Sequence, residues 1–388
     1  MLRELEQMGG GREVLREGYI DRMFREAAES LDLTPTQHTE AAKSYTSVGE
    51  WLDAPDSPLH RYRPLVCPQG SFALGTATKP LGRDDFDLDA TCVLEIPSDV
   101  SPAELKRLIG ERLRAHAVYR EMLEEKSRCW RLNYERDFHL DIIPAKPKFP
   151  RSNLTPIYIT DKELRHWLES DPKGFIAWFK ARKTIAVALF SNRGPQANVE
   201  PAPKQVHPTE KSPLQIAIQV LKRHRDVTFQ GRDDAPISII ITTLAGHAYQ
   251  QERSVVATLR SLLERMPSFI DNSRGYPCVA NPTNEAENFA DRWRTHPERE
   301  EAFYEWNGKA REDLDALCTA TGLVNVRTAL ARFLRTKRAD IVLNRMADKT
   351  NYERGGGLKI DTRTGLVGSA CGIVAPRTNF YGDSRIQL

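Results

Sequence analysis

The chain has 388 residues, of which 40% are hydrophobic and 28% are charged. This composition excludes a disordered chain, and the sequence has no run of about 18 apolar residues such as a membrane-spanning helix needs. The 56 basic residues outnumber the 53 acidic ones by three, a surplus too small to indicate a dedicated nucleic-acid-binding protein. The first residues are charged and lack the apolar stretch of a signal peptide, so we expect a cytoplasmic protein.

The first 55 residues are predicted to be helical, and Thr34 with Pro35 is a typical pair of N-cap and first helical residue. Residues 64–96 are expected to form a glycine-rich turn followed by a strand. The six cysteines contain no C-x-x-C pair and have no histidines at metal-ligand spacing, which predicts reduced, buried thiols rather than disulfides or zinc. They are Cys67, Cys92, Cys129, Cys278, Cys318 and Cys371.

A further helix is expected to begin after Ser101, which stands at capping-box spacing from Glu104, and to continue to about Glu125. Residues 129–145 then alternate between apolar and polar side chains, which predicts paired strands with one buried face and a turn at "ERD". This order of strand, helix and paired strands indicates an α+β fold, with a small mixed sheet and helices on one side of it. One parity holds Leu132, Tyr134, Phe138, Leu140 and Ile142, and the other holds Asn133, Glu135, Asp137, His139 and Asp141.

The second half of the chain is expected to be mostly helical after a proline-rich loop at 191–212. Ser212 and Pro213 begin an apolar stripe at helical spacing. The stretch "ISIIITTLAGHAY" is buried, but its periodicity does not decide between helix and strand. Two later helical runs, at about 297–320 and 325–347, lead to a tail with three consecutive glycines, which predicts flexibility.

The stretch "PQGSFALGTATKPLGRDDFDLDATCVL" holds the most informative spacing in the chain. Asp87 and Asp89 are two residues apart in a predicted strand, so their side chains project to the same side. Two carboxylates so close repel each other unless a cation lies between them, which points to Mg²⁺. Asp141, an isolated acid in a later apolar strand, is the candidate third ligand of a site for two Mg²⁺ ions, with Mn²⁺ as the alternative.

Gly70 and Ser71 complete the pattern. Glycine lets the backbone come close to a phosphate, and the Ser71 hydroxyl with the adjacent N–H groups can donate to its oxygens. A paired acid or a Gly-Ser turn by itself is usually structural, but the joint pattern is much more specific. Asp85 alternates with Asp87 as well, and we prefer Asp87 and Asp89 because the apolar strand follows them directly.

These residues resemble the polymerase-β-type nucleotidyltransferase superfamily, through "QGSFALGT", "DFDLDATCVL" and the later "FHLDIIPA". Within it the chain is similar to the bacterial relatives of cyclic GMP-AMP synthase and oligoadenylate synthase, the CD-NTases of CBASS anti-phage systems. "WLESDPKGFIAWF", "SPLQIAIQVLKRHRD" and "NPTNEAENFADRW" also look like segments of these enzymes. The resemblance implies N-terminal helices over 1–55, a polymerase-β-like nucleotidyltransferase core over 56–195, and a helical lobe with a C-terminal tail over 205–388. The active-site cleft would lie between core and lobe.

By that resemblance, Asp87, Asp89 and Asp141 would be the catalytic metal ligands, and Gly70 and Ser71 would bind the donor polyphosphate. Family enzymes also bring a lysine and a serine from the helical lobe to the terminal phosphates, and these positions match Lys222 and Ser238. The alternative for Lys222 is a solvated helix face, and for Ser238 it is the cap of a helix or strand.

The implied reaction joins NTPs into a cyclic di- or trinucleotide second messenger for anti-phage defence and releases pyrophosphate. Two other functions stay open on the sequence: a transferase that adds nucleotides to an RNA end or a small-molecule acceptor, and a non-catalytic scaffold. The resemblance implies NTP substrates and CBASS accessory proteins as partners, and no membrane. The zinc-binding insertion of the vertebrate DNA-sensing relative has no counterpart here, so we expect no zinc-dependent DNA sensing.

Overall fold

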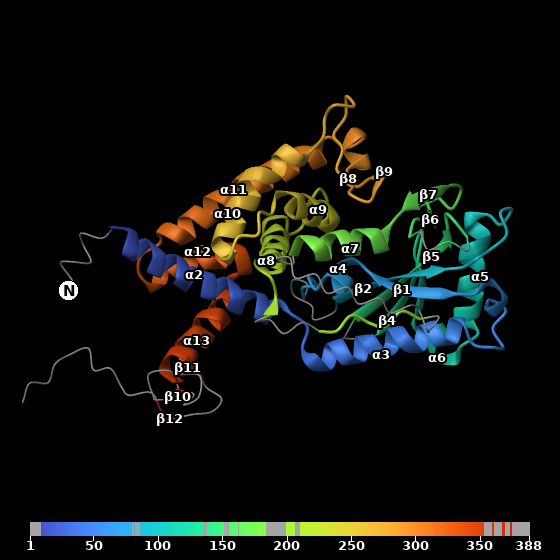
Figure 1. The fold of residues 1–388 in the computed structure, drawn as a ribbon, viewed down its shortest axis with the longest axis horizontal. Helices are drawn as coiled ribbons and strands as arrows, with labels where there is room; N and C mark the ends of the chain where they lie inside the picture. The colour runs from blue at the N-terminus through green and yellow to red at the C-terminus, as the bar shows by residue number, and fades with distance from the viewer. Residues whose placement is uncertain are drawn as a thin grey trace, which may run out of the picture.

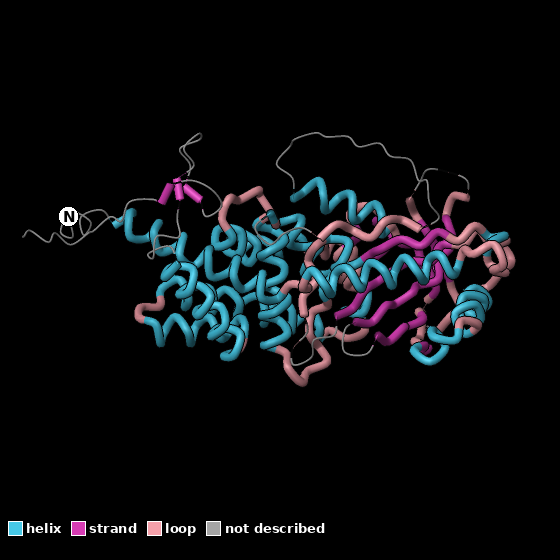
Figure 2. Tube along the Cα trace, turned by 90° about the horizontal axis from the view of Figure 1, so that it is seen from below, coloured by secondary structure: helices cyan, strands magenta, loops and turns pink. Residues whose placement is uncertain are grey.

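A seven-stranded mixed sheet forms one end of the molecule, and a helical body forms the other (Figure 1; Figure 2). The structure is a computed structural model of the chain. It describes residues 9–352, apart from 80, 82–85, 135–137, 151, 153–154, 162, 184–198 and 206–209, together with 359–360, 367–368 and 373–374.

The sheet has the strand order β1-β2-β5-β4-β3, and β6 and β7 extend it from the far end of β5. β2 and β5 run parallel and the other neighbours are antiparallel, so the expected mixed sheet is confirmed. The strands are β1 (Leu65–Gln69), β2 (Phe86–Val93), β3 (Leu123–Glu125), β4 (Trp130–Tyr134), β5 (Phe138–Pro147), β6 (Ile157–Thr160) and β7 (Trp167–Ser170).

Apolar side chains of one sheet face pack under two helices, α3 (Pro35–Leu52) and α5 (Pro102–Arg114). Leu88 of β2 and Leu140 of β5 are fully buried there, as the alternation predicted. The predicted turn at 135–137 lies outside the described residues. The apolar face is therefore covered, and the polar parity of the same strands is directed to the other side.

The N-cap predicted at Thr34 is confirmed. Its hydroxyl accepts a hydrogen bond from the backbone N–H of Gln37, and the Gln37 side chain accepts one from the backbone N–H of Thr34. Ser101 caps α5 in the same way, but Glu104 does not reciprocate, because its carboxylate pairs with Arg107.

The helix expected to reach Glu125 ends earlier, and this prediction was wrong. α5 stops at Arg114, the His116 side chain caps a short second helix, α6 (Ala117–Met122), and the next three residues form β3. Backbone pairing of β3 with β4 thus replaces the last helical turn. Sequence periodicity did not predict this strand, because its pairing with β4 is a tertiary contact and periodicity reports only local structure.

The helical body is built around α8, whose start at Ser212 and Pro213 is confirmed by a complete capping box. The undecided stretch after position 236 is a helix, α9. The run expected at 325–347 is two helices, because Arg335 adopts a left-handed backbone with φ of 66° and interrupts it. The helices are α2 (Gly9–Leu31), α8 (Pro213–Thr228), α9 (Ser238–Ala248), α10 (Val255–Arg265), α11 (Glu298–Thr319), α12 (Leu323–Leu334) and α13 (Thr336–Tyr352).

Two elements connect the body with the sheet. α7 (Pro172–Lys183) directly follows β7 and buries Phe175 and Phe179 in the helical core. A hairpin of β8 (Ala280–Asn281) and β9 (Asn284–Asn288) lies beside β7 (Figure 1). Three short strands, β10 (Lys359–Ile360), β11 (Val367–Gly368) and β12 (Ile373–Val374), pair with one another near the C-terminus; the three glycines before them lie outside the described residues.

The N-terminal helices are divided between two hydrophobic cores. α2 packs into the helical body with α8 and α13, whereas α3 packs on the sheet. The expected domain boundaries at 55 and 195–205 remain predictions.

Five described cysteines are buried and free, and Cys371 lies outside the described residues. None of the helices in the described ranges combines the length and apolar character needed to cross a membrane.

Candidate functional site

The two acids of β2 project from the polar face of the sheet. Asp87 is exposed and Asp89 is partly buried, while Leu88 and Ala90 between and after them are fully buried on the opposite face. This placement follows from the two-residue period of a strand. Asp85, the competing candidate, lies outside the described residues.

Strand register brings a third acid next to Asp89. β2 and β5 are parallel, and Asp89 stands directly opposite Asp141. On the other side of β5, Arg131 of β4 is the register partner of Asp141. Three neighbouring strands therefore present Asp89, Asp141 and Arg131 in one row.

Arg131 holds the third acid by a two-pronged salt bridge. Its Nε donates to Asp141 Oδ1 and its Nη2 to Asp141 Oδ2, both at 2.7 Å, and Nη2 also lies 3.4 Å from Asp87 Oδ1. Such paired bonds between a guanidinium and a carboxylate are among the strongest in proteins. Sequence reasoning missed Arg131, although it shares the polar parity of Asp141 in the predicted hairpin.

The environment of Asp89 favours a bound cation. Burial, together with the nearby negative charges of Asp141 and Asp87, raises the pKa of Asp89 to about 7. A divalent cation with oxygen ligands would relieve both effects, so the set of carboxylates fits Mg²⁺ chemically. Within the described ranges, no three acidic, histidine or cysteine side chains are arranged closely enough to hold a metal ion, and the Asp141 carboxylate is paired with Arg131.

Gly70 sits against Asp89 at the end of β1, where the short helix α4 (Gly70–Leu74) begins. Its φ is +63°, a left-handed conformation that favours glycine, and an added Cβ would lie 2.3 Å from Asp89 Oδ2. Only glycine fits on both counts. The Gly70–Ser71 turn and the acids therefore form one unit, as the spacing in the sequence predicted.

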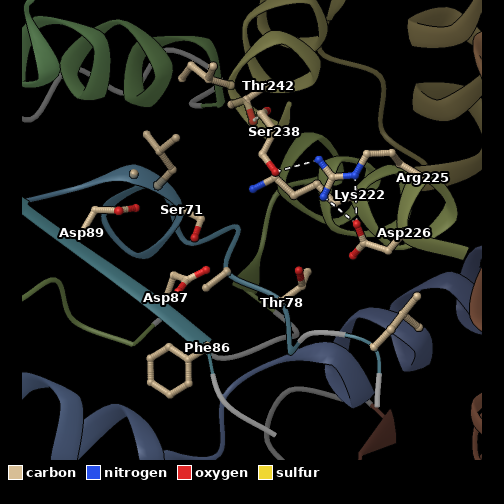
Figure 3. Close-up of a pocket in the computed structure, with 15 residues that line it drawn as sticks. Ser71, Thr78, Phe86, Asp87, Asp89, Lys222, Arg225, Asp226, Ser238 and Thr242 are labelled. Atoms are coloured by element: carbon tan, nitrogen blue, oxygen red, sulfur yellow. Dashed lines mark hydrogen bonds and ion pairs between the residues drawn. The ribbon is translucent and has the colours of Figure 1, made fainter. Parts of the chain in front are cut away.

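A cavity of about 450 Å³ opens between this unit and the helical body (Figure 3). Every predicted site residue except Asp141 lines it. Gly70, Ser71, Asp87 and Asp89 come from the sheet side, and Lys222 and Ser238 come from α8 and α9. Sequence reasoning missed several further lining residues, because their approach depends on how the two bodies pack: Leu74, Ala77, Thr78, Leu81, Phe86, Arg225, Asp226, Ile239 and Thr242.

Lys222 is 3% exposed, which contradicts the alternative of a solvated helix face. Its Nζ donates to the carbonyl oxygen of Thr76 at 3.2 Å and to Thr76 Oγ1 at 3.3 Å. Burial, together with the positive charge of Arg225, lowers the pKa of Lys222 to about 7. An ammonium in this position would gain from an anion that enters the cavity, because no carboxylate of the described residues is bonded to it.

Ser238 is the first residue of α9, and the N-cap is Ile237, so Ser238 is not the cap that the alternative assumed. The first N–H groups of a helix have no intrahelical acceptor and attract anions. Ser238 and Ile239 both line the cavity at this helix end. The cavity thus has carboxylates on one wall and donors for an anion on the other, as a metal-bound polyphosphate would require.

Comparison with known proteins finds one matching family and similar enzymes. Residues 19–183 match the SMODS family, the Second Messenger Oligonucleotide or Dinucleotide Synthetase domain. A c-di-GMP synthase of Roseivirga ehrenbergii is 31% identical over 377 residues, covering 94% of this chain and 97% of the relative. Cyclic dinucleotide synthase CdnG of Bradyrhizobium diazoefficiens is 27% identical over 388 residues, covering 90% and 91%.

The fold is also that of a solved relative. The structure of the Bradyrhizobium diazoefficiens CD-NTase CdnG in complex with GTP matches with a TM-score of 0.68 at 23% identity, covering 84% of this chain and 99% of that chain. The expected nucleotidyltransferase core with an attached helical lobe is therefore confirmed. With identity above 30% to one relative over nearly its whole length, the chain belongs to the SMODS family of CD-NTases and is a nucleotidyltransferase.

Proposed function

We propose that this nucleotidyltransferase depends on Mg²⁺ and joins two nucleoside triphosphates into a cyclic dinucleotide. The observation that carries the proposal is the pairing of Asp89 with Asp141 across from Lys222 and Ser238, with Gly70 seated against Asp89. The names of two relatives support a dinucleotide, and one of them names c-di-GMP, so GTP is the first substrate to test.

The reaction consists of two phosphoryl transfers. A ribose hydroxyl of one nucleotide attacks the α-phosphorus of the other, a new O–P bond forms, and the bond to the bridging oxygen of the leaving pyrophosphate breaks. The hydroxyl proton passes to a carboxylate or to water. A second transfer in the opposite sense closes the ring, so two triphosphates give one cyclic dinucleotide and two pyrophosphates.

Asp87, Asp89 and Asp141 would hold the metal ions. Bound Mg²⁺ would supply charge neutralisation for the triphosphate and would favour ionisation of the acceptor hydroxyl. Lys222 would donate to the polyphosphate, since its pKa of about 7 leaves it ready to take up a proton beside an anion. The Gly70–Ser71 turn and Ser238 would orient the phosphates for in-line attack.

The test is incubation of the protein with labelled NTPs and Mg²⁺, followed by phosphatase treatment and mass spectrometry. We expect a phosphatase-resistant cyclic dinucleotide, which disappears when EDTA removes the metal and in an Asp87→Asn/Asp89→Asn variant. That variant should lose several orders of magnitude in rate, because the carboxylates act as a unit. An equimolar NTP mixture yielding no cyclic product under any condition would contradict the proposal.

The two other functions are distinguished in the same experiment. Nucleotide incorporation only when RNA or a small-molecule acceptor is supplied would indicate the transferase of linear products. A protein that binds NTPs, turns none over and works in cells with both acids replaced would be a scaffold.

We also propose that the product is a second messenger in anti-phage defence, which rests on the family of the chain. Plaque counts on cells that express the wild-type protein should fall relative to cells that express the Asp87→Asn/Asp89→Asn variant. Equal plaque counts over a panel of phages would contradict this role.

A further inference from the structure

Arg225 of α8 lies at one wall of the cavity with its guanidinium between Asp226 and Ser238 (Figure 3). Its Nη1 donates to Ser238 Oγ at 3.0 Å and to the carbonyl oxygen of Pro236 at 2.9 Å. Its Nε and Nη2 donate to Asp226 Oδ1 at 2.9 and 2.6 Å. Four of its five N–H groups are thus committed, and the plane of the guanidinium is fixed on three sides.

This contact determines which way the Ser238 hydroxyl can donate. A serine hydroxyl has one hydrogen and two lone pairs, and it can turn freely about the C–O bond. Because Arg225 has no acceptor, the hydroxyl oxygen must accept in this bond, and its own hydrogen is turned away from the guanidinium. Ser238 lines the cavity, so an acceptor that enters the cavity can receive that hydrogen.

The neighbouring groups support the same direction. Among the described residues, Thr76 accepts two of the three hydrogens of the Lys222 ammonium, which leaves one for an acceptor in the cavity. The backbone carbonyl of Ser238 is already engaged by the Thr242 hydroxyl at 2.8 Å. Two donors, Lys222 and Ser238, are therefore prepared for the same anionic ligand, and Arg225 prepares one of them.

We propose that Arg225, itself held by Asp226, is a positioning residue that fixes Ser238 as a hydrogen-bond donor to the terminal phosphates of the bound nucleotide. The inference rests on the proposed function in that it takes a nucleoside triphosphate as the ligand of this cavity. It adds that the charged pair Arg225–Asp226 acts through Ser238, and that it contributes to the selection of triphosphates over monophosphates.

Equilibrium binding of a non-hydrolysable GTP analogue with Mg²⁺, measured by calorimetry, tests the proposal on Arg225→Met, Ser238→Ala and the double variant. Each single change should weaken binding about tenfold, as expected for a hydrogen bond to a charged group. The double variant should bind no worse than Ser238→Ala alone, because both changes remove the same interaction. Binding of GMP should change less than about twofold in all three.

Arg225→Lys should recover part of the lost affinity, since an ammonium can still donate to Ser238 Oγ. Arg232→Met is the matched control: it removes another arginine that is bonded to a carboxylate, Asp234, but that does not line the cavity. This control should bind the analogue like the wild type, and melting temperatures should show that every variant is folded.

Three results would overturn the inference. If the losses of affinity for the GTP analogue multiply in the double variant, Arg225 contacts the phosphates itself. Equal losses of affinity for GMP would mean a general effect on the cavity. Unchanged binding in Arg225→Met would mean that Arg225 has no role in binding. The outcome is separable from the proposed function, because binding needs no turnover. A protein that shows the expected pattern but makes no cyclic product would contradict only the proposed reaction.

Discussion

The guanidinium of Arg131 holds both carboxylate oxygens of Asp141, each at 2.7 Å. These are the oxygens that a metal ion at the proposed site would need. Arg131 supplies the positive charge that keeps Asp141 beside Asp89. An ion bound at the proposed site would compete with the guanidinium for these oxygens. The salt bridge would thus preserve the geometry of the site and oppose metal binding.

Replacement of Arg131 by Gln should therefore tighten metal binding to the free protein. We expect the dissociation constant for Mn²⁺, used as a paramagnetic probe, to fall about tenfold, because one charge-assisted bond no longer has to be broken. Electron paramagnetic resonance of free Mn²⁺ during a titration measures this directly. Arg120→Gln removes an arginine of α6 that pairs with Glu121 and should leave the affinity unchanged. Weaker binding in Arg131→Gln would show that Arg131 supports the bound metal rather than competing with it.

Gly70→Ala should strongly reduce activity through a single methyl group. The methyl would meet Asp89 Oδ2 at 2.3 Å, and the backbone would be held at a φ of +63° that alanine avoids. We expect the rate of product formation to fall at least about a hundredfold, because the turn and the carboxylate can no longer occupy their places together.

Gly231→Ala separates strain from contact. Gly231 has a φ of +80°, but an added Cβ there would meet no atom within 4 Å. Both variants should lose about 1 kcal/mol of unfolding free energy from backbone strain. Only Gly70→Ala should lose activity. Equal activity in the two variants would show that the Gly70–Ser71 turn is not part of the active site.

Lys222 should make triphosphate binding dependent on pH. Its pKa is lowered to about 7, first by burial and then by Arg225, whereas Asp226 and Asp89 act in the opposite direction. Above that pH the free amine must take up a proton to bind an anion, so affinity should fall by up to about tenfold per pH unit.

The measurement is calorimetry with the GTP analogue from about pH 7.5 to about 9.5, where the triphosphate itself stays fully ionised. Lys222→Met should bind weakly at every pH and show no slope, and its melting temperature should stay level or rise, since a costly buried amine is removed. Lys43→Met, on the exposed side of α3, should keep the wild-type slope. A slope that persists in Lys222→Met would assign the titration to another group.

Much of the sheet side of this site could be predicted, because its information is local. The two-residue period places Asp87 and Asp89 on one face, and the isolated acid in an apolar strand identifies Asp141. The Thr34 cap and the start of α8 are equally local, since their partners stand three residues away. Such local patterns predict the folded structure well, because the backbone geometry that they require is the same in any protein.

The other wall could be predicted only from the family resemblance, because it forms when two bodies pack. The apolar stripe of α8 was visible, but it does not tell which polar residue of that helix meets the sheet. Arg225 and Asp226 look like solvated charges in the sequence, and their link to Ser238 spans a loop. The strand at 123–125 was missed for the same reason, because a partner strand decides its conformation.

Asp313 of α11 illustrates how α8, which carries Lys222 and Arg225, is held in the helical body. Its buried carboxylate lies 3.1 Å from His224 Nε2, 3.0 Å from Arg332 Nη1 and 3.3 Å from Lys309 Nζ. Burial raises its pKa, but the bonds from His224 and Arg332 outweigh it and hold the pKa at about 2. The charged carboxylate is thus favoured by folding.

Asp313→Asn should cost about 2–3 kcal/mol of unfolding free energy at pH 7, as the lowered pKa implies. Because the folded pKa lies below the unfolded one, this stabilisation is complete above about pH 4 and disappears as the pH falls towards 2. Urea unfolding at pH 7, 4 and 3 should therefore show a difference in the free energy of unfolding between wild type and variant, and this gap should narrow only below about pH 4. Asp315→Asn, an exposed acid on the same helix, should show no gap at any pH. A gap of constant size for Asp313→Asn would mean that the amide fails to pack, independently of the charge, and that the ion pairs do not hold α8 in place.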